Sequence, residues 1–462
     1  MILVLLVALS SCSKKPRQDA FSFQQPMAES MRFRLAVYLL PGPAQDPAAA
    51  LQKALAAHHA QLKLVPELPK EPREPLLYAR LEKSVRLEYP PPSRERLRYG
   101  AYGLSDVQAE RLQKSERAFI VEFAHPRQNV WTALRTANTL VEEIARRTGG
   151  LVWDEETRGI YSPDAWHKAR LSTWTAEIPD VSSQTVIHIY QNDEYARAIS
   201  LGMAKMGLPD VVVQQLPWSS KGQIMHLINT FSQALAEGAA FEKSGKFNLD
   251  LHAIKNAEVR QPLLKSMGTG STGKACLLLK PAKGDEGDPE NRLIELASDR
   301  YQGNDSHARQ ESMLSSFLGV NDSIRAVHHN QELLDASAKA RARLPELQNA
   351  FNAGLQPGEF IQVKAPFSTP DGNREWMWVE VTSWKQHKIK GLLQNEPYEV
   401  TSLHSGQVVE VDDGDVFDYI RQHPDKQQEG NATAEVLQKM EDEKIVGTEI
   451  MVHAVSNACD QD

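Results

Sequence analysis

Residues 268–275, with the sequence GTGSTGKA, come within one residue of a phosphate-binding P-loop. Ala275 stands where a P-loop has the Ser or Thr whose hydroxyl reaches magnesium. A P-loop also needs a helix after its glycines, so that backbone amides converge on the phosphate. Here a helix-like stretch precedes the loop and the apolar run Cys276 to Leu279 follows it. This order predicts that the chain binds no nucleotide.

Three consecutive carboxylates, Asp154, Glu155 and Glu156, form a second group that is able to do chemistry. Paired carboxylates act as general acid and base in many enzymes. Consecutive residues, however, point in different directions, and a turn close to the double glycine Gly149-Gly150 is normally in water. The sequence therefore predicts a solvated turn here and no acid–base pair.

The histidine pairs His58-His59 and His328-His329 have no third ligand at helical or strand spacing, which a metal site requires. No Gly-x-Ser-x-Gly elbow surrounds any of the serines. We therefore expect no catalytic residues, no metal and no cofactor.

The N-terminus carries the most specific signal in the chain. Met1 to Ala8 is almost wholly apolar but too short to cross a bilayer as a helix, and Leu9-Ser10-Ser11-Cys12 follows it. This run resembles a bacterial lipoprotein signal, although no Lys or Arg precedes the apolar stretch. The resemblance implies cleavage before Cys12 and acyl chains on that cysteine. Ser13, by similarity to Gram-negative lipoproteins, implies a location on the periplasmic side of the outer membrane. The alternative is a signal-like N-terminus that never receives lipid.

Length and charge agree with an ordinary globular protein of several domains. The chain has 462 residues, of which 41% are hydrophobic and 24% charged, and a net charge of -8 that is spread along it. This balance argues against nucleic acid as the main partner. No apolar run after Ala8 approaches membrane-spanning length, so we expect the membrane to be reached only through the N-terminal lipid.

The three cysteines leave one pair open to oxidation. If Cys12 carries lipid, Cys276 and Cys459 are the possible disulfide in an oxidising compartment. The alternative is that Cys276, which lies in an apolar run, is a buried free thiol.

Alternating strand and helix patterns predict an α+β fold, with tandem α/β units followed by a helical spacer and a small β-rich C-terminal module. Val186 to Tyr190 is a predicted strand with Ile187 and Ile189 on one face and His188 and Tyr190 on the other. Residues 194–206 are predicted to be helical. The expected division is a signal at 1–12, a flexible tether at 13–30, α/β units at 31–148 and 149–300, the spacer at 301–354, the module at 355–424 and a tail at 425–462.

The C-terminal module shows closely spaced strand patterns and resembles a known family. The segments Val363–Phe367, Glu375–Val379, Gly391–Pro397 and Gly406–Val409 occur in the order seen in the YegJ-like family of bacterial domains of unknown function. The match covers residues 355–420. Because the function of this family is not established, the resemblance implies a fold but no reaction.

Alternation within the module places Trp376 and Trp378 on one strand face and Met377 and Val379 on the other. If Met377, Val379 and Val381 fill the core, the tryptophans form an exposed aromatic patch for a partner. In the alternative, the tryptophans themselves cover the core. The candidate interaction surface comprises Lys364, Glu375, Trp376, Trp378 and Asn395.

Two classes of function follow from these observations. The first is a lipid-anchored, non-catalytic binding or interaction protein, whose partner is another envelope component or a toxin-like protein. The second is an envelope hydrolase whose active site is assembled from distant segments. A pocket that gathers a carboxylate, a histidine and a hydroxyl would favour the hydrolase.

Overall fold

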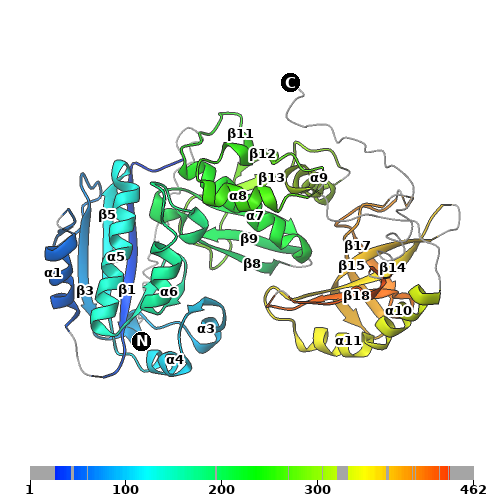
Figure 1. The fold of residues 1–462 in the computed structure, drawn as a ribbon, viewed down its shortest axis with the longest axis horizontal. Helices are drawn as coiled ribbons and strands as arrows, with labels where there is room; N and C mark the ends of the chain where they lie inside the picture. The colour runs from blue at the N-terminus through cyan, green and yellow to red at the C-terminus, as the bar shows by residue number, and fades with distance from the viewer. Residues whose placement is uncertain are drawn as a thin grey trace, which may run out of the picture.

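The computed structural model describes residues 26–436 except 43–45, 60, 193–194, 269, 304, 320–330, 371–373, 398, 401, 426 and 435. In this part the protein is a mixed α+β molecule with three sheets (Figure 1). Cys12, the N-terminal signal, His328-His329, Cys459 and most of the predicted tail lie outside the described residues. Among the residues that are described, no helix is long and apolar enough to cross a membrane.

Strand β1 lies at the centre of the first sheet and is buried along most of its length. Its order is β2-β3-β5-β1-β6-β7-β4, antiparallel except where β2 pairs with β3 and β4 with β7. Because β6 and β7 belong to it, this sheet crosses the boundary expected at residues 148–149. The strands are β1 (Ser30–Leu39), β2 (Lys63–Leu64), β3 (Leu76–Glu82), β4 (Ala101–Tyr102), β5 (Arg117–Pro126), β6 (Leu151–Asp154) and β7 (Gly159–Tyr161).

Helices cover both faces of the first sheet. The long helix α5 (Val130–Thr148) buries one apolar side and ends at Gly149, which adopts the left-handed conformation of a helix C-terminus. It packs beside α1 (Pro47–His58) (Figure 1). The opposite face carries a small separate core that includes Tyr38, Val85 and Leu112. The short helices of this side are α2 (Val85–Glu88), α3 (Arg94–Gly100) and α4 (Asp106–Gln113).

The second sheet has the order β11-β12-β13-β10-β9-β8, with β8 at an edge. Only β10 and β13 pair in parallel. Its strands are β8 (Val186–Asn192), β9 (Tyr195–Leu201), β10 (Asp210–Leu216), β11 (Lys246–Asp250), β12 (Lys274–Pro281) and β13 (Leu293–Ala297). The accompanying helices are α7 (Lys221–Ala236), α8 (Ala257–Lys265) and α9 (Ser306–Leu318), whereas α6 (Pro163–Trp166) packs against α5, β6 and β7 of the first sheet.

The hairpin of β8 and β9 confirms one prediction and corrects another. Val186 to Tyr190 is a strand, as expected, but the helix predicted for residues 194–206 is wrong. Ala196, Ala198 and Ile199 are buried on both faces of β9. A strand buried on both faces loses the apolar–polar alternation that identifies a strand, so its alanines favoured the helical interpretation.

One continuous hydrophobic core joins the first two sheets. Its buried side chains come from β1 and α5 on one side, and from β10 and α7 on the other. Trp166 of α6 is fully buried in the same core. The first two sheets are therefore packed together as one structural unit.

The third sheet is wholly antiparallel, with the order β17-β16-β15-β14-β18-β19 and its own core. Helices α10 (Gln331–Ala342) and α11 (Leu344–Ala353) pack into that core through Ala340, Leu344 and Leu347, whereas α9 packs into the first core. The predicted spacer is thus divided between two cores. The strands are β14 (Phe360–Ser368), β15 (Arg374–Lys385), β16 (Lys388–Leu393), β17 (Val408–Asp412), β18 (Asp418–Gln422) and β19 (Gln428–Gly430).

Candidate functional site

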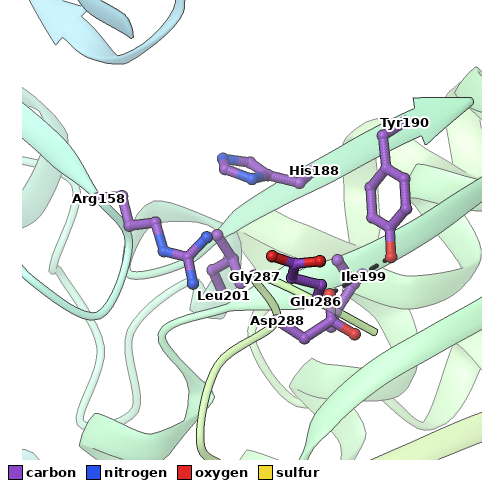
Figure 2. A pocket seen from close by; sticks show the side chains of 8 residues that line it. All are labelled: Arg158, His188, Tyr190, Ile199, Leu201, Glu286, Gly287 and Asp288. Carbon is purple, nitrogen blue, oxygen red and sulfur yellow. Dashed lines mark hydrogen bonds between the residues drawn. The ribbon is translucent and has the colours of Figure 1, made fainter. Parts of the chain in front are cut away.

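A small pocket opens at the β8 edge of the second sheet (Figure 2). Strands β8 and β9 form its floor, the turn between β6 and β7 supplies one wall, and the loop after β12 supplies the other. Its volume of about 210 Å³ is below the ~300–1,000 Å³ typical of sites for drug-sized ligands. The lining residues are Arg158, His188, Tyr190, Ile199, Leu201 and residues 286–288.

Arg158 forms the cationic wall of this pocket. Its backbone φ of 57° lies in the left-handed region, which is uncommon for any residue other than glycine. The half-buried side chain reaches toward the centre of the pocket in Figure 2. Within the described ranges its guanidinium has no hydrogen-bond or ion-pair partner. An unpaired cation is therefore held at the pocket by a turn of unfavourable backbone geometry.

His188 and Tyr190 project from the same face of β8, as their spacing predicts (Figure 2). His188 is an exposed residue, yet neighbouring protein removes part of the water around its ring. This desolvation, together with the positive charges of Arg158 and Arg96, lowers the pKa of His188. The imidazole is therefore neutral at neutral pH. Partial burial raises the pKa of Tyr190 to about 12, and its hydroxyl donates to Asp285 Oδ2 at 3.1 Å.

Arg197 holds the acidic loop of the pocket in place through ion pairs with Asp285 and Asp288. This side chain is fully buried, and its Nη1 lies 2.7 Å from Asp288 Oδ2 and also donates to the Tyr190 hydroxyl. Its Nη2 donates to the Lys283 carbonyl at 3.2 Å. Glu286, in the same loop, is exposed and makes no ion pair within the described ranges. The pocket thus sets a free carboxylate opposite the free guanidinium of Arg158.

The solvated turn predicted for the three carboxylates is wrong at Asp154. This residue is 0% exposed, and its Oδ2 lies 2.5 Å from Nζ of Lys205 and 3.3 Å from Nη2 of Arg170, which are themselves 1% and 3% exposed. Burial alone would raise the pKa of Asp154, but Lys205 and Arg170 outweigh it and lower that pKa. The partners lie 51 and 16 residues further along the chain, so no local pattern reveals them.

Of the other two carboxylates, Glu155 also anchors the turn that carries Arg158. Glu155 Oε1 lies 3.0 Å from Arg34 Nη1, and the Tyr89 hydroxyl donates to Glu155 Oε2 at 2.7 Å. Glu156 is half-buried, and burial, followed by the negative charge of Asp154, raises its pKa to about 7. The contacts of Asp154 and Glu155 hold the turn, and therefore hold Arg158 at the pocket.

The pocket contains a histidine, a hydroxyl and carboxylates, yet they do not form a catalytic relay. A nucleophile and its base lie within about 2.6–3.2 Å of each other in such a relay. The Tyr190 hydroxyl is occupied by Arg197 and Asp285, and within the described ranges the His188 ring makes no hydrogen bond. Nor do the residues described contain a group of three or more side chains suited to a metal ion.

The predicted aromatic surface is half-buried. Met377, Val379 and Val381 fill the third core, so the structure agrees with the interpretation that places Trp376 and Trp378 on the outer face. The Trp376 ring lies 4.6 Å from that of Phe417. Nζ of Lys364 lies 5.6 Å from the centre of the Trp378 ring. Three of the predicted surface residues are therefore clustered on one face of β14 and β15.

Glu375 and Asn395, the other two predicted surface residues, are buried and bind backbone amides. Glu375 Oε2 accepts from the amides of residues 399 and 400, at 3.0 and 3.1 Å, and Asn395 Oδ1 accepts from the Trp378 amide. Glu380, on the same face as the tryptophans, accepts from the Trp218 amide of the second sheet's unit at 2.7 Å. Part of this face therefore contacts the chain itself, and its role toward a partner stays a prediction.

Cys276 is buried, and its thiol donates to Asn248 Oδ1 at 3.2 Å. Its predicted disulfide partner, Cys459, lies outside the described residues, so the disulfide stays a prediction. The P-loop-like segment runs from the end of α8 to the start of β12, as the sequence predicts.

Sequence reasoning singles out none of Arg158, Arg197 or Glu286. The one available signal is the polar loop between Pro281 and Pro289, which supplies the acidic wall.

Comparison with known protein families gives a match in the C-terminal region. Residues 330–446 match the model of a family described as "Uncharacterized protein conserved in bacteria (DUF2314)". The match includes α10 and α11, in agreement with their packing on the third sheet. No curated protein and no solved structure matches the chain. The C-terminal region is therefore similar to the DUF2314 family, and the pocket lies outside the matched residues.

Proposed function

We propose that this chain is a non-catalytic binding protein of the bacterial cell envelope, whose pocket recognises a small ligand that carries both a negative and a positive group. The observation that carries the proposal is the unpaired Arg158 guanidinium, held at a φ of 57° and facing the free carboxylate of Glu286. A residue other than glycine in this conformation costs on the order of 1–3 kcal/mol, and such strain clusters at ligand sites.

The two walls suit a zwitterion such as an amino acid. Arg158 is placed to bind a carboxylate in bidentate geometry, and Glu286 to bind an ammonium group. Ile199 and Leu201 in the floor favour a short apolar substituent. The neutral His188 is able to add a hydrogen bond without a further charge. The volume of about 210 Å³ admits a ligand of this size and little more.

The test is ligand-induced stabilisation of the full chain, measured as a shift in Tm with millimolar glycine, alanine, acetate or ethylammonium. We expect glycine and alanine to raise the Tm, and the ions that carry one charge to do so less. Arg158→Gly, which suits the turn but removes the cation, should abolish the shift, whereas Arg86→Gln on α2 should retain it. A full shift in Arg158→Gly, or no shift with any probe in the wild type, would contradict the proposal.

Attachment to the envelope is the second part of the proposal. Its support is the sequence Leu9-Ser10-Ser11-Cys12 after an apolar N-terminus. We expect Cys12→Ala to move the protein from the membrane fraction to the soluble envelope fraction. Unchanged sedimentation would count against the lipid anchor on the periplasmic side of the outer membrane.

An envelope or toxin-like protein is the proposed macromolecular partner. Support comes from the half-buried Trp378 with Lys364 against its ring, because aromatic and basic side chains are common at protein interfaces. Affinity capture from intact envelopes, with Trp378→Ala as the comparison, tests whether a partner depends on this face.

A hydrolase is the second candidate function. The pocket gathers His188, Tyr190 and Asp288, which is the combination that such an enzyme needs. It would require a water molecule that joins His188 to the substrate, because the ring does not contact the Tyr190 hydroxyl. Activity toward ester or amide probes that His188→Ala abolishes would establish this candidate over the binding protein.

A further inference from the structure

We propose that the outer surface of α2, α3 and α4 contacts an anionic lipid bilayer. This surface, called here the basic apolar face, consists of Leu87, Tyr99 and Val107 with Arg86, Arg94, Arg96 and Arg98. It lies on the first sheet's unit, outside the region matched by DUF2314. The inference requires neither lipid on Cys12 nor a ligand in the pocket.

Three apolar side chains on this face are unusually exposed. Leu87 is 84% exposed, Val107 65% and Tyr99 54%, and no other large apolar side chain in the described ranges exceeds 45%. All three come from three consecutive short helices within residues 85–113. A single exposed leucine is ordinary, but this concentration in one segment marks a surface that meets something other than water.

The helix geometry directs these side chains outward from one layer. Val85, Leu97 and Leu112 of the three helices face the same small core against the first sheet. Two residues correspond to a rotation of about 200° in a helix, so Leu87 points away from Val85, and Tyr99 points away from Leu97. Five residues separate Val107 from Leu112, a rotation that places it about 140° away.

Positive charge surrounds these apolar side chains. Residues 83–113, which include all three helices, contain six basic and four acidic side chains, a local charge of +2 in a chain whose net charge is -8. Arg86, Arg94, Arg96 and Arg98 are all exposed. In the part of the chain that the structure describes, no ion pair engages any of these four. Their charges are therefore free to attract an anionic surface.

An anionic bilayer matches this combination of groups. Basic side chains near such a membrane each contribute about 1 kcal/mol of attraction to acidic headgroups. Arginine stems lie along apolar material while their guanidinium groups stay at the headgroups, and tyrosine rings favour the same interface. The protruding Leu87 and Val107 are then able to enter the boundary of the acyl chains.

The test is co-sedimentation of the full chain with vesicles of phosphatidylcholine, with and without phosphatidylglycerol. Every protein carries Cys12→Ala, so that no sample bears lipid and the N-terminus contributes equally to all of them. We expect the parent to bind vesicles with phosphatidylglycerol more tightly than phosphatidylcholine alone, and to be released by salt because the charges are exposed.

Two variants and a matched control separate the contributions. Arg96→Gln with Arg98→Gln should weaken binding to the acidic vesicles about 30-fold, from the attraction expected of two charges. Leu87→Ser should weaken it about tenfold, from partial loss of apolar insertion. The control on α10, Leu334→Ser with Arg341→Gln, removes one exposed leucine and one exposed cation elsewhere and should leave binding unchanged.

The proposal is overturned if the parent binds the acidic vesicles no better than phosphatidylcholine, or if the control loses as much binding as the face variants. The first result would rule out an anionic bilayer as the occupant of this face. Equal Tm values across the variants establish that a loss of binding does not arise from misfolding.

Discussion

Replacing Glu156 with glutamine should stabilise the protein in mildly alkaline solution and have a smaller effect in acid. Glu156 is half-buried next to Asp154, and its pKa rises from 4.5 to about 7 in the folded chain. The folded state therefore binds a proton more tightly than the unfolded state. Stability contributed by that proton is present below pH 4.5 and is lost as the pH rises through about 7. Glutamine stays neutral at every pH and avoids this loss.

The magnitude follows from the size of the shift. A change of about 2.5 pKa units, at 1.36 kcal/mol per unit, corresponds to about 3 kcal/mol when both states are fully ionised. About 0.8 kcal/mol of this has already been lost at pH 5, because the unfolded glutamate is then largely ionised. The stability advantage of Glu156→Gln should therefore grow by about 2.5 kcal/mol between pH 5 and pH 8.5.

The assay is denaturant unfolding at a series of pH values, followed by tryptophan fluorescence, to which Trp153 and Trp166 near this turn contribute. The buried Asp210, whose pKa is raised to about 6, titrates in both proteins, and because its charge also raises the pKa of Glu156, part of its pH dependence remains in the difference. Glu110→Gln on the exposed side of α4 is the control, and its difference from wild type should stay constant. A pH-independent difference for Glu156→Gln would refute the electrostatic account of this turn.

Two further predictions concern the buried ion cluster and the aromatic face. Lys205→Met should destabilise the unit by roughly 3–5 kcal/mol, because it removes one partner of a buried pair with Asp154; thermal unfolding measures this, and a loss below 1 kcal/mol would mean that the pair contributes little. Trp378→Ala should lower stability much less than Trp384→Ala, since Trp384 is buried in the third core and its truncation costs about 3–5 kcal/mol. Comparable losses in the two variants would place Trp378 among the core residues instead.

The sequence predicts those parts of the pocket that depend on the alternation of side chains along a single strand. Alternation alone places His188 and Tyr190 on one face of β8, and the structure confirms it. In β15 it separates the tryptophans from Met377 and Val379, but the choice of the buried face depends on α10 and α11 packing against Met377 and Val379.

The rest of the site depends on contacts between distant segments. Asp154 is buried because Lys205 and Arg170 neutralise it, and neither partner is near in sequence. Arg158 becomes part of a site only when the β6–β7 turn of the first sheet meets β8 and β9 of the second. No pattern within one segment encodes such a meeting.

The continuous interior that joins the first two sheets restricts how this protein can be divided. A fragment that stops after α5 would leave β1 without its neighbour β6, and would expose the side of α5 that packs against the second sheet's region. The first two sheets should therefore be kept together in gene fusions, in proteolytic fragments and in recombinants between relatives. A division after α9 and before α10 would leave both cores intact, because α9 belongs to the first core and α10 to the core of the third sheet.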